Sequence, residues 1–266
     1  MSIGDAEIKT QERVIRFFKD PEILGYQYIG NLSDYQNKNI KEDRLRQYLR
    51  LKGYADKLID AAIMQLQQEA GNLSRGVYDA NKTVYSRLKY GIPVSESPEK
   101  PPVTVELIDE TNPLNNDFAI AEEVTVVEQQ EKRPDLVIYL NGIAVAVIEL
   151  KRSSISVSEG IRQNLTNQKD SFIRGFFTTM QFCMAGNESE GLRYGTLLTG
   201  EKFYMEWKDD GFKEHEEERD PVDVRISKTC EGIENKLLKQ IYAMFDKERF
   251  IDLIMNFVVF DKGIKK

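Results

Sequence analysis

One segment constrains this chain more than any other: Arg133-Pro-Asp-Leu-Val-Ile-Tyr-Leu-Asn-Gly-Ile-Ala-Val-Ala-Val-Ile-Glu-Leu-Lys151. Two β-rich runs flank Asn141-Gly142, which is the strongest short sequence signal for a hairpin. The second run, from Ile143 to Leu150, is almost wholly apolar, as is typical of a central strand covered on both faces. Because burying an unpaired charge costs several kcal/mol, such a strand should end in Glu149-Leu-Lys151 only if these charges have a role.

The length of the turn decides whether the acidic residues of this segment meet. A two-residue turn at Asn141-Gly142 would put Asp135 and Glu149 on opposite faces of the hairpin, because side chains alternate along a strand. A three-residue turn, with Gly142 in the left-handed position of a bulge, pairs Tyr139 with Ile143 instead. The two carboxylates then share one face on a diagonal of about 7 Å. We predict the three-residue turn.

A face that carries Asp135, Glu149 and Lys151 suits metal-assisted hydrolysis of a phosphodiester. The two carboxylates would hold one Mg²⁺ or Mn²⁺ ion, whose charge neutralises the phosphate and acidifies a water molecule. Lys151 would lie beside the attacking water or a phosphate oxygen and add positive charge where negative charge develops. The residues therefore predict a DNA-cleaving site.

The pattern is specific only in its context. Glu-x-Lys occurs four times, beginning at Glu7, Glu149, Glu206 and Glu234. Only the copy at Glu149 ends an apolar strand, and only this copy follows a Pro-Asp pair, whose Asp lies 14 residues upstream of the Glu. The alternative interpretation is that these charges cap a strand at the edge of the sheet.

Composition excludes several other kinds of chemistry. The chain has 266 residues, 41% of them hydrophobic, and a formal net charge of −7, which gives no electrostatic basis for binding nucleic acid without sequence preference. Its single histidine, His215, lies in an acidic stretch and is interpreted as a solvated loop residue. One His and two distant cysteines cannot form a structural zinc site of the usual spacing. No P-loop and no Gly-x-Gly-x-x-Gly fingerprint occur.

The sequence also indicates the compartment. No apolar run approaches the roughly 18 residues that span a bilayer, and the N-terminus lacks the apolar segment of a signal peptide. We therefore expect no membrane partner and a cytoplasmic location. Cys183 and Cys230 are predicted to be free buried thiols rather than a disulfide.

The order of elements predicts a mixed sheet with helices at both ends. Helical periodicity covers Glu7–Lys19, Glu42–Glu69 and Asn81–Tyr90, and four of the eight prolines then mark a loop between Pro93 and Pro102. Further strands are predicted at 103–108, 118–127, 136–140, 143–150 and 176–185, a hairpin around Thr199-Gly200, and helices from about 158 to 172 and from 231 to 257. This order is typical of an α/β or α+β domain.

The residues quoted above resemble a family. Pro134-Asp135, Glu149 and Lys151 match the PD-(D/E)xK nuclease motif, and the surrounding segment is similar to the N-terminal nuclease region of type I restriction enzyme R subunits. The resemblance covers nearly the whole chain, through these further segments: Thr10-Gln-Glu-Arg-Val-Ile15, Leu24-Gly-Tyr26, Asn116-Asp-Phe118, Tyr194-Gly-Thr196, Trp207 and Asn256-Phe-Val-Val-Phe-Asp261.

The resemblance implies a fold, a function and partners. The fold would be an α/β restriction-endonuclease-like (PD-(D/E)xK) core, with a mixed β-sheet flanked by helices. The endonuclease domain would span residues 1–226, with a helical part at 1–92 and a strand-rich catalytic part at 103–210. Residues 227–266 would be a helical connector to a helicase motor. The subunit would use Mg²⁺ to cleave double-stranded DNA together with methylation and specificity subunits. Because the chain has no P-loop, ATP would act only through motor domains that lie outside it.

Further site residues follow from the resemblance. A Gln-x-x-x-Tyr motif lies on the family's helix after the Lys, and Gln163 takes the Gln position although Asn167 stands where the family has Tyr. Gln168 with Phe172 is the alternative register. Glu12 matches an acidic residue of the first helix that reaches the metal in the family, and a solvated helix position is the competing interpretation. Three basic residues beside the site are candidates for phosphate contacts, namely Lys132, Arg133 and Arg152.

Three hypotheses of different classes therefore remain. The first is the nuclease domain of a type I restriction enzyme. The second is a stand-alone PD-(D/E)xK nuclease in repair or defence. The third is a non-catalytic assembly module whose charges only cap strands.

Overall fold

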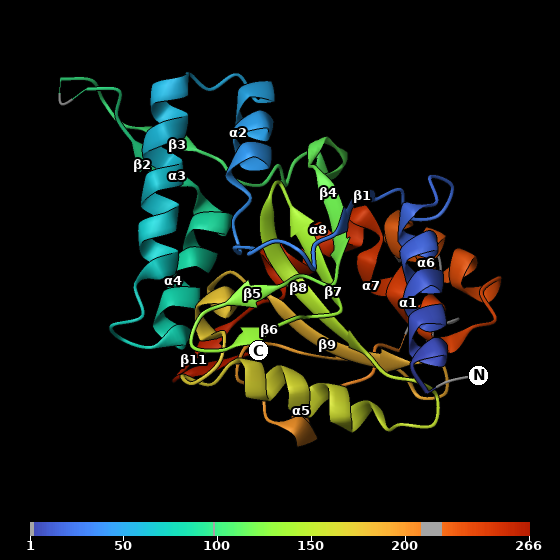
Figure 1. Cartoon of the computed structure of the whole chain (residues 1–266). Coiled ribbons are helices and arrows are strands. Elements are labelled where there is room, and N and C mark those ends of the chain that lie inside the picture. The colour runs from blue at the N-terminus through green and yellow to red at the C-terminus, as the bar shows by residue number, and fades with distance from the viewer. Residues whose placement is uncertain (1–2, 98, 209–219) are drawn as a thin grey trace.

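The computed structural model describes residues 3–97, 99–208 and 220–266 (Figure 1). The α-helices in these ranges are α1 (Ile3–Lys19), α2 (Glu42–Leu51), α3 (Asp56–Gly71), α4 (Val77–Tyr90), α5 (Val157–Asn167), α6 (Pro221–Glu231), α7 (Lys236–Phe245) and α8 (Lys247–Asn256). Short 3₁₀ helices are η1 (Pro113–Asn115), η2 (Arg174–Thr178) and η3 (Glu201–Phe203). The strands are β1 (Gln27–Asn31), β2 (Ile92–Val94), β3 (Val103–Val105), β4 (Phe118–Glu122), β5 (Val126–Val127), β6 (Glu131–Lys132), β7 (Leu136–Leu140), β8 (Ile143–Leu150), β9 (Phe182–Asn187), β10 (Gly191–Gly195), β11 (Phe260–Asp261) and β12 (Ile264–Lys265).

A mixed sheet forms the centre of the molecule, in the strand order β1-β4-β7-β8-β9-β10. β1 pairs with β4 in parallel, as does β8 with β9, and the other neighbours are antiparallel. Every residue of β7 and β8 is buried, which confirms the prediction of a central hairpin covered on both faces. The predicted mixed sheet flanked by helices is likewise confirmed.

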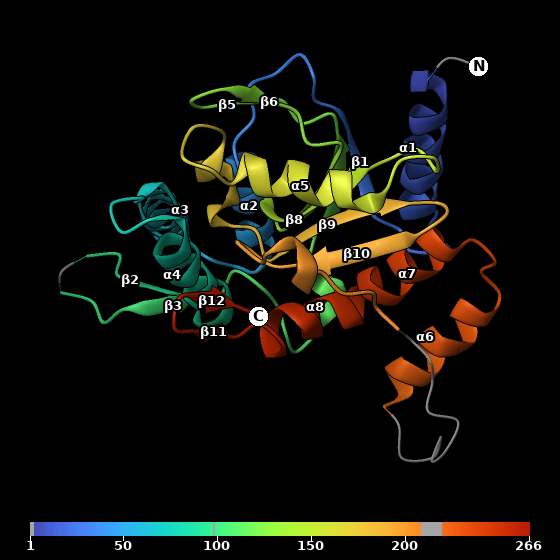
Figure 2. The same ribbon diagram turned by 90° about the horizontal axis from the view of Figure 1, so that it is seen from below.

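Different elements cover the two faces of the sheet. Figure 2 shows α5 and the β5–β6 ribbon on one side, with α7 and α8 on the other. The larger hydrophobic core includes Ile138 and Ile148 and residues of α1, α7 and α8. The smaller core includes Val137 and Val147 together with Phe177 of η2. Because side chains alternate along a strand, Asp135 and Glu149 belong to the side of the smaller core.

The predicted three-residue turn is wrong. Leu140 pairs with Ile143, so the turn has two residues, and Asn141 and Gly142 both have positive φ (52° and 81°), as a type I′ turn requires. The bulge lies farther along β8, because Ile138 pairs with Ala146 and Tyr139 with Ala144, which leaves Val145 as the extra residue.

The bulge reverses the alternation that a two-residue turn would otherwise impose. Beyond it Leu136 pairs with Ile148, and this register brings Asp135 directly opposite Glu149. The same side of the hairpin therefore carries both acids, but by a different route from the one predicted, and they face each other directly rather than on a diagonal.

Other predicted boundaries shift for local reasons. The helical stretch Glu42–Glu69 is two helices, because Gly53 adopts a positive φ of 85° between them. The strand predicted at 103–108 is confined to β3, and the one predicted at 176–185 begins as η2 before β9. The hairpin predicted around Thr199-Gly200 is reduced to one bridge, Tyr194 with Met205, beside η3.

Three further expectations concern single features. Cys183 and Cys230 are buried thiols that form no disulfide with each other, as predicted. His215 lies outside the described residues. None of the helices in the described ranges is long and apolar enough to cross a membrane.

Candidate active site

The candidate site lies where β7 begins and β8 ends, at one end of the sheet. Asp135 immediately precedes β7, and its carbonyl accepts a hydrogen bond from the Glu123 N–H (2.9 Å). Its Oδ2 accepts a second hydrogen bond from the Leu150 N–H across the hairpin (2.7 Å). The backbone of the two neighbouring strand ends therefore holds this carboxylate in place.

Glu149 is completely buried in β8. Its Oε2 accepts a hydrogen bond from Gln163 Nε2 of α5 (2.7 Å). Its Oε1 is also buried and accepts no hydrogen bond from any donor in the described residues. A buried carboxylate oxygen without a donor is costly, so this oxygen marks a position that lacks a partner.

The close approach of α5 to the sheet explains how Gln163 reaches Glu149. A Cβ added to Gly160 would lie 2.9 Å from Ala185 Cβ of β9 and 3.4 Å from Glu149 Cβ. The missing side chain of Gly160 thus allows the first turns of α5 to rest on β8 and β9, and Gln163 follows one turn later on the same side.

Lys151 follows β8 directly and carries the positive charge of the site. Its side chain is 15% exposed, and its Nζ donates to the Leu150 carbonyl (3.0 Å) and to Glu7 Oε1 of α1 (3.4 Å). The sequence-predicted trio of Asp135, Glu149 and Lys151 therefore gathers at one end of the hairpin.

Burial and the charges of neighbouring acids raise the pKa values of Asp135 and Glu149. Burial raises the pKa of Asp135 to about 6, against the attraction of Lys151 and the Leu150 N–H, while Glu123 and Glu7 raise it further. Burial raises the pKa of Glu149 well above its ordinary value, and the charge of Asp135 adds to this rise. The pair thus favours holding a proton when no cation is present.

The donor set fits a small hard cation. Carboxylate oxygens are the ligands that Mg²⁺ and Mn²⁺ prefer, and Glu149 Oε1 has no other partner. Among the described residues, no group of three His, Cys, Asp or Glu side chains is placed to hold a metal ion. In enzymes that act on phosphates, Mg²⁺ is usually bound by one or two carboxylates. Water molecules and phosphate oxygens fill its remaining coordination positions.

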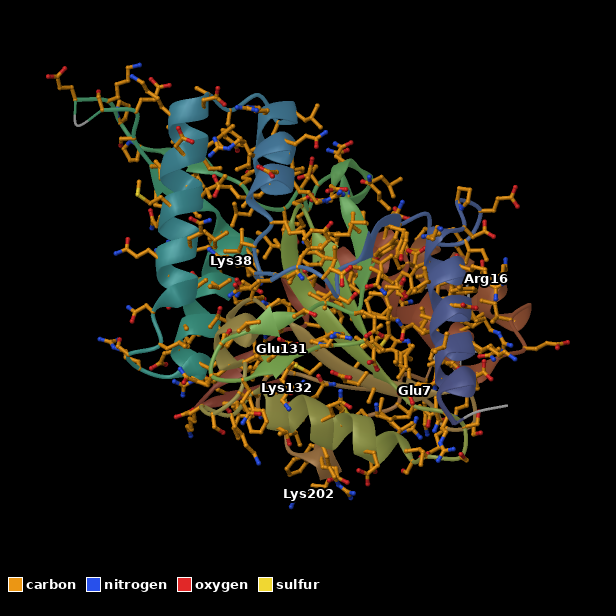
Figure 3. All side chains as sticks on the ribbon, in the orientation of Figure 1. Glu7, Arg16, Lys38, Glu131, Lys132 and Lys202 are labelled. Atoms are coloured by element: carbon orange, nitrogen blue, oxygen red, sulfur yellow. The ribbon has the colours of Figure 1, made fainter. Side chains whose placement is uncertain are left out.

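The structure does not bring Glu12 to this pair. Glu12 is exposed on α1, and the acidic residue of that helix that contacts the trio is Glu7. Figure 3 places Glu7 near the N-terminal end of α1.

The three predicted phosphate-binding residues lie in the segments next to the trio: Lys132 ends β6, Arg133 lies between β6 and β7, and Arg152 follows Lys151. Lys132 of β6 lies above α5 in Figure 3, with its ammonium 4.8 Å from the centre of the Phe172 ring. Arg133 is exposed and donates through Nε to Thr125 Oγ1 (3.2 Å). Arg152 is partly buried, and within the described ranges no hydrogen bond or ion pair involves its side chain.

The two registers proposed for the Gln motif differ clearly in their surroundings. Gln163 contacts Glu149, whereas Gln168 donates to Cys183 Sγ (3.6 Å) and accepts from the Leu198 N–H (2.7 Å). Asn167 is buried, and its carbonyl accepts from the Ile173 N–H (3.2 Å). The Gln163 register is therefore the one that reaches the acids.

Sequence reasoning missed two residues that join α1 to the site, Glu7 and Gln11. Gln11 Nε2 donates to Glu122 Oε2 (3.0 Å) and Glu123 Oε1 (3.1 Å) at the end of β4. Their spacing of four on a helix was the available signal, because such residues share one face. It could not have identified the partner strand.

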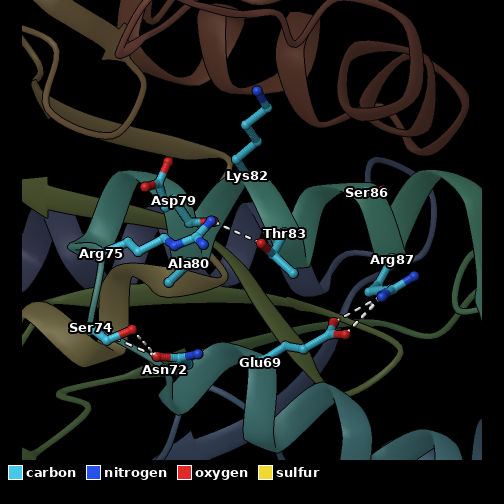
Figure 4. Close-up of a pocket in the computed structure, with 10 residues that line it drawn as sticks. All are labelled: Glu69, Asn72, Ser74, Arg75, Asp79, Ala80, Lys82, Thr83, Ser86 and Arg87. Atoms are coloured by element: carbon cyan, nitrogen blue, oxygen red, sulfur yellow. Dashed lines mark hydrogen bonds and ion pairs between the residues drawn. The ribbon is translucent and has the colours of Figure 1, made fainter.

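A cavity lies elsewhere, between α3 and α4. Its volume is about 640 Å³, and its lining residues are Glu69, Asn72, Ser74, Arg75, Asp79, Ala80, Lys82, Thr83, Ser86 and Arg87 (Figure 4). Arg87 and Glu69, whose charged groups are 2.8 Å apart, neutralise each other there. Since none of the predicted site residues lines this cavity, volume alone does not locate the chemistry.

Comparison with known proteins places the chain in a family. The family described as type I restriction enzyme R protein N terminus matches residues 7–203. A Methanocaldococcus jannaschii protein, assigned as the endonuclease subunit of type I restriction enzyme MjaIXP, is 27% identical over 202 residues, which are 68% of this chain and 18% of that protein.

A second relative comes from Staphylococcus saprophyticus and is named as the endonuclease subunit of type I restriction enzyme SsaAORF53P. It is 29% identical over 112 residues, which are 40% of this chain and 12% of that protein. The chain thus spans less than a fifth of the length of these relatives. The matched residues 7–203 include the whole Asp135, Glu149 and Lys151 trio, and the chain belongs to the family of type I restriction enzyme R protein N-terminal domains.

Proposed function

We propose that this chain is the metal-dependent endonuclease domain of a type I restriction enzyme R subunit, with a PD-(D/E)xK core, and that it hydrolyses phosphodiester bonds of double-stranded DNA. The observation that carries the proposal is the facing pair of carboxyl groups, Asp135 and the fully buried Glu149, with Lys151 at the same strand end. Family membership supports the same conclusion, because both relatives are named as endonuclease subunits.

Asp135 and Glu149 would hold the Mg²⁺ or Mn²⁺ ion. When bound, the cation neutralises phosphate charge and lowers the pKa of a coordinated water. The Leu150 N–H orients the Asp135 carboxylate, and the Gln163 amide orients that of Glu149. The Lys151 ammonium adds positive charge at the phosphate as negative charge develops in the transition state.

The partners follow from the family and from charge. An acidic chain with a net charge of −7 is poorly suited to capturing DNA alone. We propose that methylation and specificity subunits, and ATP-driven motor domains beyond residues 227–266, deliver the duplex. The complex would act in the cytoplasm. Lys132, Arg133 and Arg152 would contact phosphates beside the trio.

A cleavage assay tests the proposal on the complete subunit assembled with its partners. Supercoiled plasmid with Mg²⁺ and ATP should be cut by the wild type, and Asp135→Ala, Glu149→Ala or Lys151→Ala should lower the cleavage rate by about 10²- to 10³-fold. ATP hydrolysis should stay intact. Lys57→Ala, which removes an exposed lysine of α3, is the matched control and should cut normally.

The remaining outcomes separate the alternatives. Loss of cleavage and ATP hydrolysis together would point to misfolding, which the unfolding temperature of each variant checks. Cleavage by this chain alone without ATP would favour a stand-alone nuclease. A calorimetric titration with Mn²⁺ tests the metal site. If the wild type binds no Mn²⁺, or binds it no more tightly than Glu149→Gln does, the metal site is contradicted and an assembly module is favoured.

A further inference from the structure

One of the two acceptors that hold the ammonium of Lys151 belongs to a residue that is distant in sequence. Apart from the adjacent Leu150 carbonyl (3.0 Å), its described hydrogen-bond partner is Glu7 Oε1, at 3.4 Å and 144 positions away. Only 15% of the Lys151 side chain is exposed, and that of Glu7 is 36% exposed. A lysine has a flexible four-carbon stem, so an acceptor on a second element is needed to define where its charge lies.

The helix that supplies Glu7 is itself tied to the site. Gln11 lies one turn farther along α1 and is 8% exposed. Its amide donates to both Glu122 and Glu123, and the Glu123 N–H donates to the Asp135 carbonyl (2.9 Å). Because Glu7 and Gln11 are four residues apart, the same face of α1 contacts Lys151 and the segment Glu122–Glu123, which is bonded to the backbone of Asp135.

We infer that Glu7 is a positioning residue of the active site, which accepts a hydrogen bond from Lys151 and keeps its ammonium beside Asp135 and Glu149. This inference rests on the proposed nuclease function. Glu12, on the same helix, has an exposed side chain. Without Glu7, the Lys151 stem is free to move its charge toward solvent, away from the position where the phosphate reacts.

The first test compares two changes on the same helix. In the complete subunit complex, Glu7→Gln should lower kcat for plasmid cleavage about tenfold with KM unchanged, because DNA binding does not depend on this contact. Glu12→Gln removes the same charge from an exposed position and should keep the wild-type kcat. Glu7→Asp, which retains the charge on a shorter stem, should recover part of the loss. Equal kcat in Glu7→Gln and wild type, or an equal loss in Glu12→Gln, would overturn the assignment.

The second test does not need activity. In this chain labelled with ¹⁵N-lysine, the hydrogen-bonded ammonium of Lys151 should give an NMR signal that is absent in Lys151→Arg. The signal should broaden or vanish in Glu7→Ala, which removes the acceptor, and remain in Glu12→Ala, with all variants folded by their unfolding temperatures. Persistence of the signal in Glu7→Ala would overturn the contact. A wild-type complex that cuts no DNA would instead refute the nuclease function, and the positioning role with it.

Discussion

At the scale of single residues, the strongest physical constraint is the pairing of Asp135 and Glu149. Burial disfavours the charged form of each acid, and the charge of Asp135 further disfavours the charged form of Glu149. Lys151 offsets this only in part. Such an arrangement is unfavourable for folding without a cation and suits a site in which a cation belongs.

The pair should therefore destabilise the metal-free chain as the pH rises. The folded-state pKa of Asp135 is raised from 3.8 to about 6, so its stabilising contribution is complete below pH 3.8 and is lost as the pH rises through about 6. Relative to Asp135→Asn, the wild type should lose about 2 kcal/mol of unfolding free energy across this window. Glu149 shifts in the same direction, and Lys151 opposes both.

Urea unfolding of the two proteins at several pH values without metal measures this difference. Added Mg²⁺ should restore the stability of the wild type at the upper end of the window, because it binds only the folded pair. A difference between the two proteins that does not change with pH would show that Asp135 titrates normally.

At the scale of elements, α5 reaches the sheet because one of its residues has no side chain. Gly160→Ala would put a methyl group 2.9 Å from Ala185 Cβ, so α5 must move and carry Gln163 away from Glu149. Plasmid cleavage by the complete complex should fall at least tenfold. Gly71→Ala, at the end of α3 with nothing within 4 Å of the new methyl group, is the matched control and should cleave normally. Wild-type cleavage by Gly160→Ala would show that this close contact is not needed.

The hairpin turn is a second element that depends on glycine. Gly142 has a φ of 81°, and a Cβ there would lie 2.7 Å from Leu45 N and Lys41 O. Gly53 has a similar φ of 85° with nothing within 4 Å. Gly53→Ala should therefore cost about 1–2 kcal/mol for the backbone alone, and Gly142→Ala should cost clearly more. Chemical denaturation measures both, and equal losses would rule out a packing contribution at the turn.

At the scale of the whole molecule, a buried lysine anchors the C-terminal ribbon, which consists of β11 and β12, in the core. Lys265 is 1% exposed, and its Nζ donates to Asn81 Oδ1 (2.9 Å), Met180 O (2.9 Å) and Gln181 Oε1 (2.6 Å). Burial lowers its pKa well below the ordinary value. The Gln181 N–H in turn donates to Val145 O at the bulge (2.7 Å). The ribbon is thus joined to the strand that carries Glu149.

Lys265→Ala should cost about 3 kcal/mol of unfolding free energy, because it leaves a cavity and removes the donor from buried amide oxygens. Lys266→Ala changes a neighbouring side chain that is 64% exposed and should stay within about 0.5 kcal/mol of the wild type. Thermal or urea unfolding compares the two. A small loss in Lys265→Ala would mean that the ribbon contributes little to the core.

The sequence by itself determined the central hairpin, the mixed sheet and the three residues of the candidate site. These features depend on local pattern: an apolar run long enough for a buried strand, an Asn-Gly turn, and charges where such a strand ends. The sequence also identified Gln163, through its spacing from Glu149 and through the resemblance to a family.

Only the tertiary structure decided the register of that hairpin and the role of α1. The bulge at Val145 leaves no mark in an apolar run, because the backbone N–H that bonds to Val145 belongs to Gln181, a residue distant in sequence that directly precedes β9. The same holds for Glu7, whose contact with Lys151 joins residues 144 positions apart. Contacts of this kind depend on how separate elements pack, and periodicity along the chain carries no information about which distant element lies alongside.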